Sequence, residues 1–178
     1  MAAQLSYSYQ TPRGVAGSLF DIAPYAINSR VNGETKPNVL MFGMGAVHGA
    51  TPGVDVLAPT DADTADKFEG VVMTSFTNQM NMLGDIRIFH LQTVGILRYG
   101  HAWVRIVDGI EPEYGEALFL VNDGDDAGMF TNDPNEGIAI MGRFIGPAGT
   151  GPGSIGDGTT VPINIAPAEI YDQMNTAL

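Results

Sequence analysis

The stretch from Gln92 to Asp108 alternates between apolar and polar side chains over its second half, after Gly100. It is rich in β-branched and aromatic residues and contains no proline, which is typical of a paired, half-buried strand. Successive side chains on a strand face opposite sides, so one set would meet a core and the other would meet solvent or a partner. The first set is Ala102, Val104 and Ile106, and the second is His101, Trp103, Arg105 and Val107.

This stretch therefore predicts a long central strand that has no chemistry of its own. Gly100 lies in its middle, where a bulge or bend is expected. A large ring on a strand face is rarely left bare, so Trp103 should be buried or held in an interface.

Shorter apolar runs separated by turn residues predict further strands through most of the chain. The turns recur roughly every 8–12 residues, the spacing found in sandwiches and barrels, and we expect about eight to ten short strands. The sequence thus predicts one all-β domain, sandwich or barrel-like (jelly-roll or related), over residues 18–166. The expected strands lie near residues 39–42, 46–47, 54–56, 71–73, 86–88, 117–121, 129–131, 138–145 and 161–165.

The connections carry more specific expectations. Asn32 and Gly33 form the dipeptide favoured by type I′ turns, which predicts a hairpin there. The acidic stretch 60–67 predicts one helical turn capped by Thr60. Two long loops are expected, at residues 74–85 and 146–160, the second because of its many glycines.

Both ends of the chain are expected to differ from the domain. Residues 1–17 predict an extended N-terminal arm, since the alternating Leu5, Tyr7 and Tyr9 are followed at once by Pro12, Gly14 and Gly17. Such an arm either is a loose tail or becomes ordered against a neighbouring subunit, and local features favour neither.

Residues 167–178 predict a short helical tail. Pro167 suits a first turn, and Ile170, Tyr171, Met174 and Leu178 follow at helical spacing. A helix of this length is marginal by itself in water, so it should dock on something.

Composition narrows the class of function. Acidic residues outnumber basic ones 20 to 8, for a formal net charge of −12, which argues against contact with nucleic-acid phosphates. The chain has no cysteine, so neither disulfides nor thiolate chemistry is available. We also expect no secretory signal in the first ten residues, and no membrane span, because the apolar runs fall far short of about 20 residues.

No segment of the sequence matches a complete catalytic, cofactor-binding or metal-binding motif. His48, His90 and His101 are too scattered for a zinc box. The acidic stretch 122–128 lacks the ligand spacing of the twelve-residue calcium loop, so it predicts an acidic hairpin turn, with an irregular ion site as the alternative. The glycines of the 146–160 loop match a dinucleotide pattern formally, but a strand follows them where that motif needs a helix. We expect no enzyme, no cofactor and no metal.

Four segments, in this order, resemble the structural cement or head decoration proteins of tailed bacteriophages. They are VAG at Val15–Gly17, DKFEGVV at Asp66–Val72, GILRYGHAWVRIVDGIEPEYGEALFLV at Gly95–Val121, and GRFI at Gly142–Ile145. The resemblance covers most of residues 7–145. The chain departs from the plain family pattern in the 74–85 loop, the 146–160 loop and the predicted helical tail.

The resemblance implies a virion structural protein that decorates and cements the capsid exterior and is present in the host cytoplasm before assembly. Its partners would be the major capsid protein, whose neighbouring subunits it would bridge, and other copies of itself on the lattice. We expect the arm to be dispensable for folding and needed for assembly. The candidate capsid contacts are Leu5, Tyr7, Tyr9, Arg13 and Val15.

An alternative hypothesis is a β-sandwich binding module on the virion surface that contacts a host glycan or receptor. That function would need exposed aromatic rings over a shallow groove. The candidate rings are Trp103, Tyr99 and Tyr114.

Overall fold

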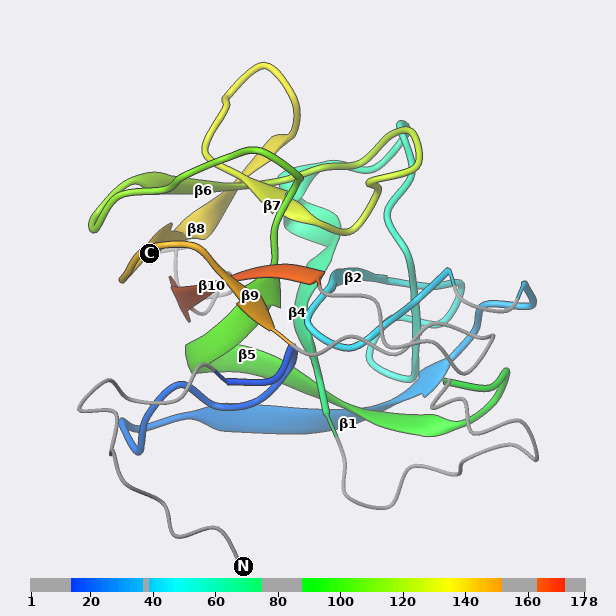
Figure 1. Cartoon of the computed structure of the whole chain (residues 1–178). Helices are drawn as coiled ribbons and strands as arrows, with labels where there is room; N and C mark the ends of the chain where they lie inside the picture. The colour runs from blue at the N-terminus through cyan, green and yellow to red at the C-terminus, as the bar shows by residue number, and fades with distance from the viewer. Residues whose placement is uncertain (1–13, 37–38, 75–87, 152–162, 172–178) are drawn as a thin grey trace, which may run out of the picture.

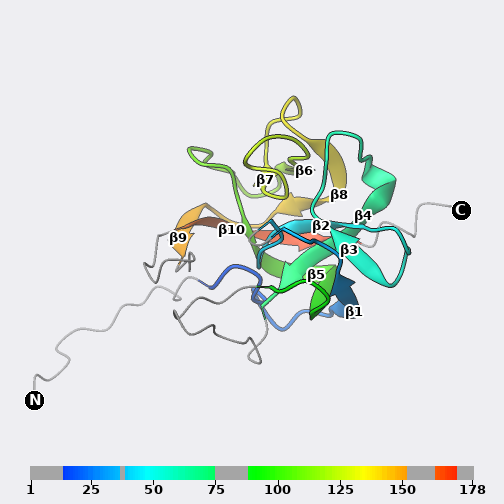
Figure 2. The ribbon, with the colours of Figure 1, turned by 90° about the vertical axis from the view of Figure 1, so that its right-hand side faces the viewer.

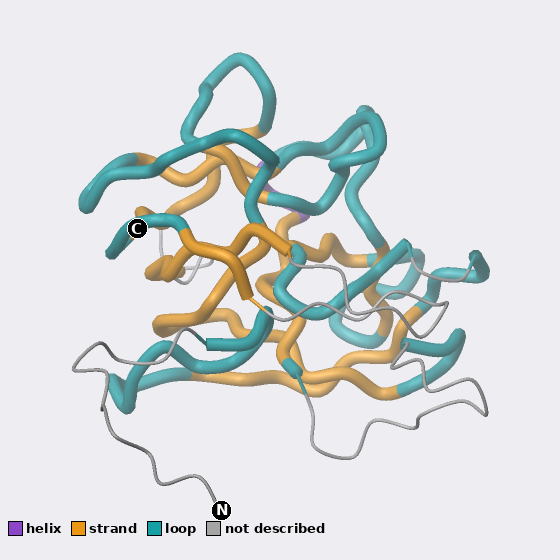
Figure 3. Tube along the Cα trace, in the orientation of Figure 1, coloured by secondary structure: helices purple, strands orange, loops and turns teal. Residues whose placement is uncertain are grey.

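A computed structural model describes residues 14–36, 39–74, 88–151 and 163–171 (Figure 1). Figure 3 shows that strands and their connecting loops make up nearly all of this part of the chain, so the predicted all-β class is confirmed. The described elements are β1 (Ala26–Asn32), β2 (Gly45–His48), β3 (Asp55–Leu57), the 3-10 turn η1 (Ala65–Lys67), β4 (Phe68–Met73), β5 (Thr93–Arg105), β6 (Ala117–Leu120), β7 (Phe130–Thr131), β8 (Ile138–Phe144), β9 (Gly149–Gly151) and β10 (Ile163–Ile170).

The first half of β5 closes a small barrel. It pairs antiparallel with β1 and with β4. From β4 the sheet continues through β2 to β3, and β3 returns parallel to the end of β1. Because β1 also pairs with β5, these five strands form a ring that has few open edges.

The second half of β5 begins another set of strands. It pairs with β10, and the order continues through β8 and β6 to β7. A β-bridge between Phe130 of β7 and Ile106 connects the last strand of this set to the end of β5. β9 pairs antiparallel with β10. Figure 1 shows β1 below β5 and the strands β6 to β8 above it, and the same order holds in the side view of Figure 2.

β4 and the first half of β5, around Ile96 and Leu97, are buried on both faces, because a core lies on each side of them. Val72 and Ile96 belong to the core inside the small barrel. Val71 and Leu97, their chain neighbours, belong to the larger core under β6, β8 and β10. All four side chains are fully buried, as expected when alternate positions of a strand face two packed layers.

The structure confirms the alternation predicted for the central strand. Ala102, Val104 and Ile106 all lie in the larger core. Gly100 supplies the expected bend: its φ is 128°, and an added Cβ would come within 2.7 Å of the Tyr25 Cβ. Only glycine adopts that backbone without strain.

The predicted C-terminal helix is wrong where the structure describes it. Residues 163–170 form β10, which hydrogen-bonds to β5 on one side and to β8 and β9 on the other. Ile165, Ala166, Ala168 and Ile170 are fully buried. Pairing on both edges supplies hydrogen-bond partners and packing that a short isolated helix lacks. Residues 172–178 lie outside the described part of the chain.

Two local predictions also fail. Asn32 and Gly33 form no hairpin turn, because neither residue has a positive φ and their amides donate to the carbonyls of Gln92 and Val56. Tertiary pairing therefore overrides the local turn preference. The short helical turn does exist, as η1, but Thr64 and not Thr60 precedes it, and Thr60 instead donates to the Asp63 carboxylate.

The two predicted loops lie largely outside the described residues. Of residues 74–85 only Thr74 is described, and of residues 146–160 the segment 149–151 forms β9. In the described ranges, no helix is long and apolar enough to cross a membrane.

Leu97→Ala should lower the free energy of unfolding by about 2–5 kcal/mol, because Leu97 is fully buried where both halves of the fold meet. Chemical denaturation of the variant measures the loss. Thr93→Ala, at an exposed position of the same strand, is the control and should change stability by about 0.5 kcal/mol or less. Equal effects for the two variants would contradict the two-core arrangement.

Candidate functional site

Residues 14–20 pack against the second half of β5. Gly17 N donates to the Trp103 carbonyl at 2.8 Å, Trp103 N to the Ser18 carbonyl at 2.9 Å, and Phe20 N to the His101 carbonyl at 2.9 Å. Ala16 is buried, with 2% of its surface exposed. The last residues of the predicted arm therefore pack on the domain, while residues 1–13 lie outside the described residues. The division into arm, domain and tail stays a prediction.

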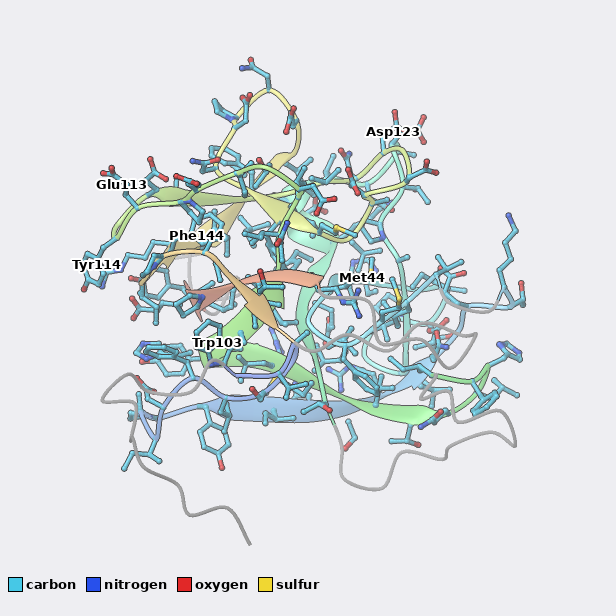
Figure 4. All side chains as sticks on the ribbon, in the orientation of Figure 1. Met44, Trp103, Glu113, Tyr114, Asp123 and Phe144 are labelled. Carbon is cyan, nitrogen blue, oxygen red and sulfur yellow. The ribbon has the colours of Figure 1, made fainter. Side chains whose placement is uncertain are left out.

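Trp103 is half-buried, and the chain itself covers it. Gly14 lies so close to the indole that an added Cβ would stand 2.0 Å from Trp103 Cδ1. Phe20 meets the same ring edge-on, with the centroids 5.4 Å apart. Such edge contacts stabilise aromatic pairs. Figure 4 shows Trp103 beside the N-terminal ribbon, whereas Tyr114 lies at the outer edge of the molecule.

Several large apolar side chains near this segment are exposed, and we call them the apolar strip. Ile22 is fully exposed and Tyr25 is 53% exposed. Tyr99 lies opposite Ala26 in the pairing of β5 with β1. Within residues 20–29 the only charged residue before Arg30 is Asp21. The apolar strip consists of Val15, Phe20, Ile22, Tyr25, Ile27 and Tyr99.

A chain of ionic contacts crosses the neighbouring strands and holds this region to the sheet. His101 Nδ1 lies 2.7 Å from Asp21 Oδ2, and its Nε2 lies 3.4 Å from Glu169 Oε1. Glu169 also accepts from Arg143 Nε at 2.8 Å and from the Tyr171 hydroxyl at 3.0 Å. His101, Glu169 and Arg143 lie on adjacent strands in register, so the contacts follow from strand pairing.

These contacts shift the pKa values of the groups involved. Desolvation by itself lowers the pKa of His101, but the hydrogen bonds and charges of Asp21 and Glu169 outweigh it, so the pKa is raised. The hydrogen bond to His101 lowers the pKa of Asp21. Desolvation raises the pKa of Glu169, but hydrogen bonds from Arg143, Tyr171 and His101 lower it further than burial raises it. The two carboxylates therefore favour the protonated imidazole more than water does around a free histidine.

Arg105 lies two residues beyond Trp103 on the same face of β5. Its Nε donates to the Phe42 carbonyl at 2.9 Å, and its backbone N donates to the Gly43 carbonyl at 2.8 Å. The side chain is half-buried, and desolvation lowers the pKa of its guanidinium.

The acidic turn after β6 lies elsewhere, as the position of Asp123 in Figure 4 shows. It borders a hollow of about 490 Å³ whose lining includes Asp123, Asp125, Asp126 and Glu136. Over the described ranges, no three His, Asp or Glu side chains come together in a way that could hold a metal ion.

The structure places only one of the five predicted contact residues. Val15 is exposed, at 46% of its surface, whereas Leu5, Tyr7, Tyr9 and Arg13 lie outside the described residues. The sequence did not single out the residues of the apolar strip between Phe20 and Ile27. The sequence does offer one indication of this surface: residues 20–29 contain a single charged residue, although the chain as a whole is strongly acidic.

The three rings proposed for a binding module do not form a platform. Trp103 is covered by Gly14 and Phe20. Tyr114 is 72% exposed and carries Arg143 over its ring at 6.0 Å. Figure 4 places Tyr114 and Trp103 on different parts of the molecule.

Comparisons with known proteins agree with this picture. The family model described as structural cement protein (E217 gp24/Pam3 gp6) matches residues 3–166. A chain from the capsid of Myoviridae phage XM1 is similar in fold, with a TM-score of 0.62 and 14% identity over 96% of this chain and 98% of that chain. No curated protein matches the sequence.

With this family match, the all-β chain is a structural protein of the virion that associates with capsid proteins. It belongs to the structural cement protein family, as the resemblance of its sequence segments predicted.

Gly14→Ala should shift the tryptophan emission to longer wavelength, because the new Cβ cannot occupy its place against the indole. Trp103 is the single tryptophan, so its fluorescence reports the packing of residues 14–20 directly. The stability loss should be small, on the order of 1 kcal/mol. Ser29→Ala, at an exposed position of β1, should leave the emission unchanged. An unaltered spectrum for Gly14→Ala would show that the segment does not cover the ring in solution.

Wild-type protein should be more stable than His101→Gln in mildly acidic solution, and the difference should shrink as the pH rises. The raised pKa of His101 means that its contribution is fully present below its unfolded-state value of about 6.5 and is lost as the pH rises through the folded-state value. The lowered pKa values of Asp21 and Glu169 act in the opposite direction, so their contribution is lost as the pH falls toward the folded-state values.

The stability difference should therefore be largest between about pH 5 and 6, at no more than about 1 kcal/mol because the pair is partly exposed. Urea unfolding at a series of pH values measures it. Thr93→Ala, which removes no titratable group and lies outside the network, is the control and should follow the pH profile of the wild type. A difference independent of pH would mean that the ion pairs contribute nothing.

Proposed function

We propose that this protein cements the outside of a phage capsid by bridging neighbouring major capsid protein subunits. The observation that carries the proposal is the exposed apolar strip beside the N-terminal segment, in a chain that belongs to the structural cement protein family. The fold holds one end of the segment, at Gly14 to Phe20, against β5. In this proposal the residues before Gly14 contact a subunit next to the one on which the domain rests.

The distribution of charge supports this use of the surface. The chain carries a net charge of −12, which keeps free copies soluble and apart before assembly. The apolar strip contains no charged side chain, and the carboxylate of the intervening Asp21 is paired with His101. An exposed apolar patch of this kind marks an interaction surface.

Geometry supports bridging as well. Thirteen residues precede Gly14, and that length spans at most about 45 Å when fully extended. A standard interface buries about 800 Å² on each partner, and an extended segment supplies a large share of such an area. Contacts of moderate strength, repeated by other copies over the lattice, add up through multivalency.

The proposed contact residues are Leu5, Tyr7, Tyr9, Arg13 and Val15, joined by the apolar strip. The binding-module hypothesis has less support, because Trp103 is covered and the 490 Å³ hollow is lined by no aromatic residue. The proposal includes no catalytic step. It assigns the protein to the capsid exterior, after a period in the host cytoplasm.

Removing residues 1–13 should leave the melting temperature nearly unchanged and should weaken binding to undecorated particles by tenfold or more, about 1.4 kcal/mol. Val15→Asp in the full chain should weaken binding in the same direction, because a charge would have to be desolvated at the contact. Co-sedimentation with particles measures both effects.

Val54→Asp is the matched control, since Val54 is the same residue type and is 53% exposed, compared with 46% for Val15. It should bind as the wild type does. Undiminished binding of the shortened chain would move the contact surface elsewhere, and a shortened chain that no longer folds would make these residues part of the domain.

A further inference from the structure

Arg105 is a partly buried cation that has no carboxylate partner among the described residues, unlike three other cationic side chains. Arg30 pairs with Glu69, Lys67 with Asp63, and Arg143 with Glu169. Arg105 has no ion pair with a described residue, although the chain contains 20 acidic residues. Its one side-chain hydrogen bond within the described ranges is from Nε to the Phe42 carbonyl, which leaves the two terminal nitrogens without a protein acceptor there.

This isolation is costly because the side chain is half-buried. Desolvation lowers the pKa of Arg105, and no neighbouring carboxylate opposes that effect. A buried or partly buried charge is normally paired, and an unpaired one destabilises the fold. The planar guanidinium offers its terminal N–H groups in a fork that matches a carboxylate in two parallel hydrogen bonds.

Arg105 is also adjacent to the proposed contact surface. Its backbone and side chain both bond to the segment Phe42–Gly43. That segment packs on the N-terminal residues, since an added Cβ on Gly43 would stand 2.8 Å from the Ala16 Cβ. Val15, one of the proposed contacts, is the next residue along the chain and is exposed. A partner subunit that meets Val15 is therefore positioned to reach the guanidinium.

We propose that Arg105 binds a carboxylate side chain of the major capsid protein subunit that the N-terminal segment contacts, an inference that rests on the proposed function. The partner's Asp or Glu would complete an ion pair that no described residue of the chain supplies. A capsid subunit fits better than a second copy of this protein, because two copies that each carry −12 repel one another.

Arg105→Gln tests the proposal, with binding to undecorated particles measured over a range of salt concentrations. We expect about tenfold weaker binding at low salt, because truncating one partner of a charge pair raises the dissociation rate. The salt dependence of binding should also be smaller than for the wild type, since one screened attraction is gone. The melting temperature should stay the same or rise.

Lys36→Gln is the matched control, because it removes the same unit charge from an exposed position. It should leave both the affinity and its salt dependence close to those of the wild type. Arg105→Lys, which keeps the charge but loses the fork, should recover part of the binding, and Arg105→Met, which keeps only the bulk, should not. Stronger binding by the Lys variant than by the Met variant would show that the charge of residue 105 matters for binding. This comparison holds even where a variant melts at a lower temperature.

The inference would be overturned if Arg105→Gln bound particles as tightly as the wild type at every salt concentration. The proposed function would still stand in that case. Failure of the wild type to bind particles would instead overturn the proposed function, and the inference with it. Sedimentation of the protein alone gives the third readout. Self-association that Arg105→Gln abolishes, with particle binding intact, would assign the carboxylate to a second copy and overturn the inference.

Discussion

The pairing of β5 along both of its halves is the interaction on which the rest of the structure depends. Its first half joins β1 and β4 and closes the small barrel, and its second half joins β10 and starts the other set of strands. Backbone polar groups at the centre of a protein need hydrogen-bond partners, so one long strand that finds them in both sets holds the two together. The bend at Gly100 lets the strand change partners midway.

The same strand positions the surface that we assign to function. Ala102 and Val104 face the larger core, so His101, Trp103 and Arg105 face the other way. His101 forms an ion pair with Asp21, and the Trp103 ring packs against Gly14 and Phe20. Arg105 donates a hydrogen bond to the Phe42 carbonyl. All three side chains project from one strand that packs on a core, so their contacts hold the loop segment 14–25, which carries most of the apolar strip, against a rigid element.

Charge distribution gives this surface its character. Arg30, Lys67 and Arg143 form ion pairs within the chain, whereas the apolar strip has no charged side chain and Arg105 has no acidic partner among the described residues. A strongly acidic protein that must pack closely on a lattice gains from a nearly neutral contact surface, because like charges repel at short range. The arginine at its border is the charge that we propose to pair with a carboxylate of the capsid subunit.

The β class, the two faces of β5 and the bend at Gly100 could be predicted from the sequence, because side-chain alternation and turn residues are local properties of the chain. The family could be predicted as well, from the four segments that resemble it. The sequence also determined that Trp103 and Arg105 share a face. Only the tertiary structure decided that residues 163–170 form a strand, that Asn32 and Gly33 pair with Gln92 and Val56, and that five strands close into a barrel. It alone showed that Gly14 covers Trp103 and that Arg105 has no acidic partner among the described residues. Each of these facts depends on which distant segments of the chain lie side by side. Local propensities for helix, strand or turn are under about 1 kcal/mol per residue, so burial and strand pairing outweigh them.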